Sequence, residues 1–306
     1  GNGTAAAPAA PASAAASAAA DKPASSPAPS SAPRRPHPCL PQPLSPVETA
    51  PLAFITGASS GIGQALADAY ARQGWRLALV ACRAADMQAW AAARGLGPDR
   101  CVLYPADVAD IDAITAAGRA CIAAQGVPDV VIANAGISAG VDSAFREDLD
   151  VIARIYALNN VGLAATFQPF IAPMRARGSG RLVGIASVAG IRGLPGHGGY
   201  CASKAAVISY CESLRGELRG TGVKVVTLAP GYVDTPLTRE NRYPMPFLLA
   251  PAEFARRALP VIAAGRSYRV IPWQMGVVAK LLRLLPDAWF DRALQGRARK
   301  HRHTGF

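Results

Sequence analysis

The residues best suited to proton transfer are Tyr200 and Lys204, which stand four positions apart in a stretch with a helical pattern. On a helix this spacing puts both side chains on one face, one turn apart. An ammonium group beside a phenol favours the phenolate, so we expect Lys204 to lower the pKa of Tyr200 from about 10 toward the range useful for acid/base chemistry. Ser187 ends an apolar run upstream and could hold a substrate oxygen. Alone, the pair also fits an exposed tyrosine beside a solvated lysine.

The elements that must position these residues follow from the hydrophobic pattern after residue 50. Short apolar runs alternate with helical patterns, and they fall at 52–56, 76–81, 101–104, 129–132, 181–186, 223–228 and 268–271. Strands that alternate with helices predict a parallel sheet with helices on both faces, and unbroken apolar runs suit strands buried on both sides. We therefore expect an α/β fold, a Rossmann-type doubly wound sheet, with one long helix at about 149–175.

A glycine-rich turn follows the first predicted strand. Gly57, Gly61 and Gly63 form the pattern Gly-x-x-x-Gly-x-Gly at the start of a helix. Glycines there let the backbone approach a pyrophosphate, and a helix N-terminus offers free N–H groups and the positive end of its dipole. The alternative is a tight turn that binds nothing.

Five motifs together resemble the short-chain dehydrogenase/reductase family over roughly residues 51–272. They are residues 56–63, Asn134-Ala135-Gly136, Ser187, Tyr200-x-x-x-Lys204 and residues 230–235, in the order and spacing of that family. The resemblance implies an NAD(P)-dependent oxidoreductase that transfers hydride between nicotinamide and a ketone or secondary alcohol. It also implies an oligomer.

The resemblance assigns a role to each matching residue. Tyr200 is expected to be the general acid/base, Lys204 to bind the nicotinamide ribose and lower the Tyr200 pKa, and Ser187 to position the substrate oxygen. Asn159 is expected to complete the catalytic set, with Asn160 as the alternative one position along, unless Asn159 is buried only for helix packing. The residues expected to bind the cofactor are Gly57, Ser59, Ser60, Gly61, Ile62, Gly63, Arg83, Asp107, Val108, Asn134, Tyr200, Lys204, Val233 and Thr235. No metal ligand set is expected.

Within that set, Asp107 and Val108 are expected at the adenine ring, and Val233 and Thr235 at the nicotinamide carboxamide. Asn134 is expected near the adenosine ribose or as a brace for the central strand. NAD-preferring members usually carry an acid after the second strand, whereas this chain has Arg83, which can pair with a phosphate. The sequence therefore favours NADP over NAD, although Arg83 could also be a solvated loop charge.

The substrate side is expected at residues 236–250, where the family has a variable lid. Its second half is apolar, with Met245, Phe247, Leu248 and Leu249, which suggests an apolar lipid-like or aromatic carbonyl or else core packing. His197 is expected at the pocket rim as a pocket residue and not as a catalyst.

The two ends of the chain differ in composition from the middle. Residues 1–49 are rich in Ala, Pro and Ser, with 11 of the 26 prolines, and are predicted to be disordered. Residues 50–275 form the expected catalytic domain. Residues 276–306 form a predicted basic helical tail, and of the net charge of +12 the segment 265–306 carries +7.

Partners and location follow from these features. The pattern around 273–286 is a basic amphipathic helix that could lie on an anionic membrane surface, cap the domain or pack in an oligomer. No apolar run spans a bilayer, and scattered cysteines predict a cytoplasmic protein, with membrane association as the alternative. We expect a small-molecule substrate and no nucleic acid. Two rival functions are a cofactor-sensing binding protein with low turnover and a membrane-surface scaffold that uses the tail.

Overall fold

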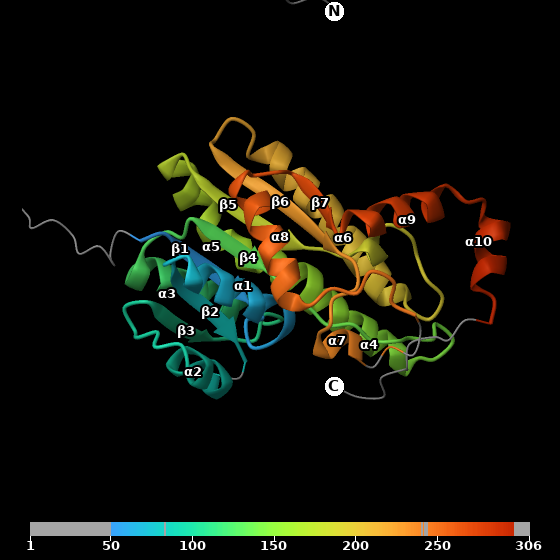
Figure 1. Cartoon of the computed structure of the whole chain (residues 1–306), viewed down its shortest axis with the longest axis horizontal. Coiled ribbons are helices and arrows are strands. Elements are labelled where there is room, and N and C mark those ends of the chain that lie inside the picture. Colours follow the sequence, from blue (N-terminus) through green and yellow to red (C-terminus); the bar gives the residue numbers. More distant parts are fainter. Residues whose placement is uncertain (1–49, 83, 240, 242–243, 297–306) are drawn as a thin grey trace, which may run out of the picture. The chain divides into compact units, whose positions relative to one another are not determined.

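The computed structural model describes residues 50–82, 84–239, 241 and 244–296, so the predicted disordered segment 1–49 lies outside the described residues. In the described part, seven parallel strands form one sheet in the order β3-β2-β1-β4-β5-β6-β7 (Figure 1). The strands are β1 (Leu52–Thr56), β2 (Arg76–Ala81), β3 (Cys101–Pro105), β4 (Val130–Ala133), β5 (Gly180–Ile185), β6 (Val223–Pro230) and β7 (Tyr268–Ile271). The predicted Rossmann-type α/β fold is confirmed.

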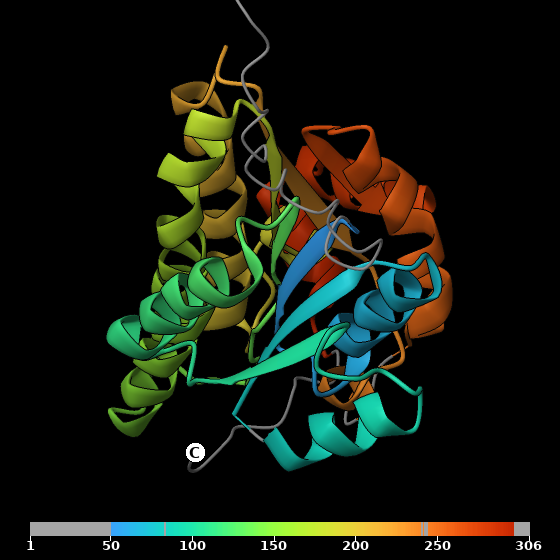
Figure 2. The same ribbon diagram turned by 90° about the vertical axis from the view of Figure 1, so that its left-hand side faces the viewer.

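Helices cover both faces of the sheet, as Figure 2 shows edge-on. One face carries α1 (Gly61–Arg72), α2 (Ala84–Ala92) and α8 (Pro251–Ala263). The other carries α3 (Ile111–Gln125), α5 (Gly162–Arg177) and α6 (Gly198–Glu217), and α4 (Glu147–Tyr156) packs against α6 with a small apolar cluster of its own. Successive strand residues point to opposite faces, so Phe54 packs in the second layer and its neighbour Ile55 in the first. Both layers are apolar, which explains why the strands read as unbroken hydrophobic runs.

The strand order reverses next to β1, and this reversal positions the site. The chain moves outward from β1 through β2 to β3, returns through α3, and continues on the other side of β1 with β4, where Ala53 pairs with Val130. Asp110 begins α3, because its carboxylate accepts a hydrogen bond from the Ala113 N–H at 3.0 Å. Loops that leave β1 and β4 therefore diverge and open a crevice at the carboxyl ends of the strands.

The single long helix predicted at 149–175 is interrupted. The structure has α4, then a π-helical turn at Ala157–Val161, then α5. A π-helical turn accommodates one extra residue and changes the direction in which the following side chains point. Both candidate asparagines, Asn159 and Asn160, lie in this turn. The predicted long helix is therefore present from 147 to 177, and it contains a π-helical turn that hydrophobic periodicity does not register.

Beyond β7 the chain forms two helices, α9 (Trp273–Leu284) and α10 (Asp287–Leu294), where one amphipathic helix over 273–286 was predicted. Pro286 stands between them at the N-cap of α10. Proline has no N–H to donate within a helix but fits just before a helix begins, so it separates the two segments. Among the described residues, no helix combines the length and apolarity that crossing a bilayer demands. Residues 297–306 of the predicted tail lie outside the described residues.

Candidate active site

A cavity of about 1890 Å³ follows the carboxyl ends of the strands. It extends from the glycine loop after β1, past the ends of β2 and β3, to the loops after β5 and β6, and α9 and α10 close its far end. Ligands in doubly wound folds bind at this edge, at the reversal of strand order. Of the predicted site residues, only Gly63, Asn159 and Arg83 are not among its lining, and Arg83 lies outside the described residues.

The glycine loop is built for close backbone approach. Gly57 and Gly61 have φ angles of +66° and +55°, which side-chain-bearing residues rarely adopt. A Cβ on Gly63 would collide with the Gly57 carbonyl and would lie 2.5 Å from Asn134 Nδ2. Gly63 therefore lies beneath the loop and lets α1 pack against it, which explains why it does not line the cavity.

Asn134 joins this loop to the central strand. Its Nδ2 donates to the carbonyl oxygens of Thr56 at 3.1 Å and Gly57 at 3.2 Å. The backbone N–H of Asn134 in turn donates to Thr56 Oγ1 at 3.1 Å. Of the two positions anticipated for Asn134, the structure therefore has it bracing the central strands and the glycine loop.

The N-terminus of α1 has an anion-binding character. Ser60 is its N-cap with extended backbone and makes no capping hydrogen bond with its side chain, and the first turn has no acidic residue. The free N–H groups and hydroxyls of this end therefore face the cavity together with Ser59, Gly61 and Ile62. A pyrophosphate fits the charge and the backbone of this cradle.

At the β2 and β3 end of the cavity, Asp107 is the acid among the described lining residues, and its carboxylate is already hydrogen-bonded. Asp107 accepts hydrogen bonds from Arg154 Nη2 and from the Ala109 N–H, both at 2.9 Å, and the Arg154 bond is the main reason why its pKa lies below the usual value. Val108 is buried beside it against α5. Cys82, which is exposed, directly follows β2 here.

The loop after β6 covers the glycine loop from the opposite side. Val233 and Thr235 are buried, and a Cβ on Gly61 would lie 3.1 Å from Thr235 Cγ2. Thr238 fixes this loop, because its hydroxyl donates to the Val233 carbonyl at 2.5 Å and accepts from the Thr235 N–H at 3.1 Å. Both residues that the resemblance assigns to the carboxamide therefore lie in the cavity wall.

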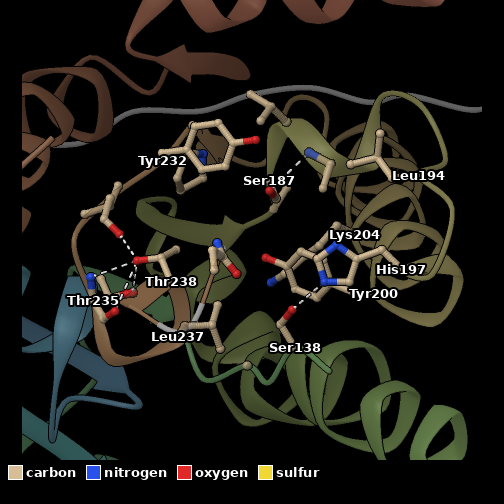
Figure 3. A pocket seen from close by; sticks show the side chains of 18 of the residues that line it. Ser138, Ser187, Leu194, His197, Tyr200, Lys204, Tyr232, Thr235, Leu237 and Thr238 are labelled. Atoms are coloured by element: carbon tan, nitrogen blue, oxygen red, sulfur yellow. Dashed lines mark hydrogen bonds between the residues drawn. The ribbon is translucent and has the colours of Figure 1, made fainter. Parts of the chain in front are cut away.

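Ser187, Tyr200 and Lys204 come together at the middle of the cavity (Figure 3). Ser187 lies two residues beyond the end of β5, and its Oγ accepts a hydrogen bond from the Ala189 N–H at 3.1 Å. Tyr200 and Lys204 lie one turn apart on α6, and Lys204 Nζ is 5.8 Å from the centre of the Tyr200 ring. Lys204 Nζ donates to the Ile185 carbonyl at 2.8 Å, which holds the ammonium at the end of β5.

The pKa values of this pair differ from the sequence-based expectation. Burial raises the pKa of Tyr200 to about 12, and the Ser187 hydroxyl opposes this shift only in part. Burial also lowers the pKa of Lys204 from 10.5 to about 8. Among the chain's own groups, loss of solvation therefore outweighs the Ser187 hydrogen bond, and the expectation of a lowered Tyr200 pKa was wrong for these groups alone.

Asn159 lies behind this centre and is fully enclosed. Its Oδ1 accepts from the Ile137 N–H at 2.9 Å, and its Nδ2 donates to the Ile137 carbonyl and to Ser203 Oγ, both at 3.0 Å. Asn160 instead donates to the Ser203 carbonyl at 2.8 Å. A Cβ on Gly136 would lie 3.2 Å from Asn159 Oδ1 and 3.4 Å from Lys204 Nζ, so both of these atoms border Gly136.

His197, which was expected at the rim of the pocket, lies in the cavity wall. Its ring centre is 5.2 Å from that of Tyr200, and its Nε2 lies 3.0 Å from the hydroxyl of Ser138 (Figure 3). Ser138 was missed from the sequence, although it follows the Asn134-Ala135-Gly136 motif by two positions and so leaves the end of β4 into the same crevice.

The expected lid segment does border the cavity, with Pro236, Leu237, Thr238, Asn241, Pro244 and Pro246 in its lining, but the four apolar residues singled out from the sequence do not. Met245, Phe247, Leu248 and Leu249 do not line the cavity; Phe247 and Leu248 are about half exposed, and Leu249 packs on the core. The apolar wall comes instead from α9 and α10, with Met275, Val278, Leu282, Phe290 and Leu294. That correction has a plain cause, because the sequence does not show that α9 folds back over the site.

Arg192 holds the two C-terminal helices in this position and was also missed. Its guanidinium donates to the carbonyl oxygens of Leu282 and, at 2.8 Å, of Leu285, and to Asp287 Oδ1 at 2.9 Å. The same group lies 3.8 Å from the centre of the Phe290 ring. Nothing local in the sequence connects Arg192 with partners 90 or more positions later.

Comparison with known proteins identifies the family. A family model described as short chain dehydrogenase matches residues 51–245. An uncharacterized oxidoreductase of Myxococcus xanthus is 39% identical over 244 residues, which cover 79% of this chain and 95% of that protein. An acetoacetyl-CoA reductase of an Acinetobacter species is 30% identical over 71% of this chain and 92% of its own.

Solved structures agree with this result. A short-chain dehydrogenase/reductase from Burkholderia phymatum in complex with NAD superposes with a TM-score of 0.69 and 25% identity, over 81% of this chain and 96% of that one. The glycine cradle, the strand reversal and the matched motifs all lie within the shared region. The chain belongs to the short-chain dehydrogenase/reductase family of oxidoreductases.

Proposed function

We propose that the chain reduces apolar ketones, or oxidises the corresponding secondary alcohols, with NADPH or NADP as its nicotinamide cofactor. The observation that carries this proposal is the convergence of Tyr200, Ser187 and Lys204 in one cavity with the glycine cradle. When bound, the cofactor supplies or accepts hydride at its nicotinamide ring. Every other step falls to side chains of the chain.

Tyr200 is the proton donor in reduction, since a phenol with a pKa of about 12 stays protonated at neutral pH. Ser187, which lines the cavity beside it, donates a hydrogen bond to the same substrate oxygen and holds the carbonyl in place. Lys204 carries positive charge below pH about 8 and stabilises negative charge that develops on the Tyr200 oxygen. Asn159 positions Lys204 by fixing the backbone at Ile137 and the side chain of Ser203.

NADP is favoured because an acid is missing where a 2′-hydroxyl would be recognised. The sequence after β2 is Cys82-Arg83, and Asp107, the acid of the described lining at that end of the cavity, is paired with Arg154. We assign Arg83 to the 2′-phosphate. An Arg83→Ala variant should bind NADPH at least about tenfold more weakly and NADH unchanged. Equally weakened binding of both dinucleotides would show that Arg83 does not bind the 2′-phosphate.

An apolar substrate is favoured by the wall beyond Tyr200. Met275, Val278 and Leu282 of α9 face Phe290 and Leu294 of α10 across the far end of the cavity, and burial of apolar surface there contributes about 25 cal/mol for each Å². Polar groups gather instead around Tyr200, where the carbonyl must lie. Ketones with a long alkyl or fused-ring body therefore suit the cavity better than small hydrophilic ones.

The experiment is a screen of ketone substrates in which turnover is measured as the loss of NADPH absorbance. Methyl ketones of increasing alkyl length should show a KM that falls with each added methylene, and acetoacetyl-CoA belongs in the series because a relative is named for reducing it. Tyr200→Phe should bind NADPH like the wild type but lose turnover. A protein that binds NADPH yet turns over none of these carbonyls would favour the rival function, a cofactor-sensing binding protein. We propose a homo-oligomer by analogy with the family.

A further inference from the structure

Helix α9 is apolar on two opposite sides. One side is buried and lines the cavity with Met275, Val278 and Leu282. The other side is exposed, with 62% of Trp273, 47% of Val277, 60% of Leu281 and 79% of Leu284 accessible. A helix that covers a core needs only the first of these sides to be apolar. The outer side therefore calls for a separate explanation.

The four exposed residues form one stripe. At 100° per residue, Trp273, Val277, Leu281 and Leu284 fall within an arc of about 80°. Lys280 and Arg283 are exposed and lie along one edge of that arc. We call these six residues the outer face of α9. An apolar stripe with long cations beside it is the pattern of a helix that lies flat in the interface of an anionic membrane, where lysine and arginine stems extend toward headgroups.

The outer face is held at a fixed angle to the domain. Arg192 binds the carbonyl oxygens of Leu282 and Leu285 at the end of α9, and Gly276 packs against Val270 of β7 near its start. Both ends of α9 are therefore attached to the catalytic domain. The apolar stripe projects from a rigid support, so binding it to a surface requires no ordering of the helix.

We propose that the outer face of α9 is a membrane-binding surface that inserts into the headgroup region of anionic phospholipid. A second copy of this chain is a poorer occupant. The stripe is about 17 Å long and about 10 Å wide, a footprint well below the roughly 800 Å² that each partner buries in a standard interface. A twofold contact through the stripe would also bring Lys280 and Arg283 close to their own copies.

Electrostatics favours an anionic surface over a neutral one. In α10 the exposed Arg292 is balanced by the exposed Asp291, and Asp287 is paired with Arg192, so the excess of positive charge comes from Lys280 and Arg283. The sequence then carries Arg297, Arg299, Lys300 and Arg302. Each cation near an anionic surface contributes about 1 kcal/mol. The exposed indole of Trp273 suits the boundary between water and acyl chains.

The two sides of α9 give this surface a consequence for the cavity. The same helix would contact lipid with one side and form the cavity wall with the other, so an apolar compound dissolved in the membrane would be one helix diameter away from the site. This consequence rests on the proposed function, but lipid binding itself does not.

The test is co-sedimentation of the full chain with phosphatidylcholine vesicles, with and without phosphatidylglycerol. The wild type should sediment with the mixed vesicles, release at high salt, and show a blue shift of tryptophan emission that Trp273→Ser reduces. Leu281→Asp should weaken partitioning about tenfold or more. Ile111→Asp is the matched control, since Ile111 is also about half exposed but lies at the start of α3, and it should bind vesicles like the wild type.

Three results would overturn the proposal. The first is that the wild type stays in the supernatant with mixed vesicles. The second is that Leu281→Asp sediments as well as the wild type. The third is that Ile111→Asp loses vesicle binding as much as Leu281→Asp does. Light scattering without lipid completes the test. An oligomer that Leu281→Asp dissociates, together with absent vesicle binding, would assign the outer face to a second copy of the chain. None of these readouts depends on turnover.

Discussion

The cradle beneath the glycine loop allows a sharp test with two helical glycines. Gly63 in α1 and Gly216 in α6 both have ordinary helical backbone, and each can be replaced by alanine. A Cβ at Gly216 meets nothing within 4 Å, whereas at Gly63 it collides with the Gly57 carbonyl and lies 2.5 Å from Asn134 Nδ2. Helix propensity alone would make both variants more stable by about 0.5–1 kcal/mol.

At Gly63, steric conflict makes the change in the free energy of unfolding destabilising instead of stabilising. Inserting a methyl group into a packed site costs about 1–3 kcal/mol, and here the atoms that must move are a backbone carbonyl and the amide that binds it. We therefore expect Gly63→Ala to lower the free energy of unfolding by about 0.5–2 kcal/mol, after subtracting the gain in propensity. Gly216→Ala should raise it by about 0.5 kcal/mol, because its position near the end of α6 limits the gain.

Urea unfolding of both variants measures these free energies, and NADPH fluorescence titration measures binding by the cradle. Gly63→Ala should also bind NADPH at least about tenfold more weakly, because the displaced loop no longer fits a pyrophosphate. Gly216→Ala should bind like the wild type. A Gly63→Ala protein as stable as Gly216→Ala, with wild-type NADPH affinity, would refute the reasoning.

Three further predictions concern the pair on α6, the π-helical turn and the C-terminal helices. Because the pKa of Tyr200 is raised to about 12, the rate of ketone reduction should be nearly independent of pH between about 6 and 8. The rate of alcohol oxidation needs the phenolate and should rise about tenfold per pH unit over this range. An oxidation rate that stays flat would contradict the assignment of Tyr200. Asn159→Ala should cost about 2 kcal/mol or more in urea unfolding, because it leaves Ile137 and Ser203 groups unpaired, and Asn160→Ala should cost less. Arg192→Ala should increase protease cleavage between α9 and α10 and raise the KM for long ketones. Arg192→Lys should give intermediate values, because a lysine lacks the planar fork of the guanidinium. Unchanged cleavage would show that other contacts hold the two helices.

Much of the fold follows from local patterns. The predicted strands at 52–56, 76–81 and 268–271 match β1, β2 and β7 residue for residue. For β1 and β2 the reason is that strands buried on both faces have no polar alternation. The positions of Ser187, Tyr200 and Lys204 in one cavity follow from strand order and helical spacing. These features depend on short stretches of sequence, so local patterns were sufficient to predict them.

The remainder depends on contacts between distant segments. The π-helical turn at Ala157–Val161 adds one residue without disturbing the apolar pattern, so a regular helix was expected. The Tyr200 pKa depends on burial and on the Ser187 hydroxyl, and neither is visible in a four-residue spacing. The apolar wall formed by α9 depends on Arg192, whose partners lie far along the chain.

The central claim is that the cavity from the glycine cradle to Tyr200 holds a nicotinamide dinucleotide. Isothermal titration of the full chain with NADPH and with NADH tests it most directly. We expect one NADPH to bind per chain, with NADH at least about tenfold weaker, since no unpaired acid faces a 2′-phosphate at the described end of the cavity. Absence of binding for both dinucleotides would contradict the account of the site, and tighter binding of NADH would contradict the cofactor preference alone.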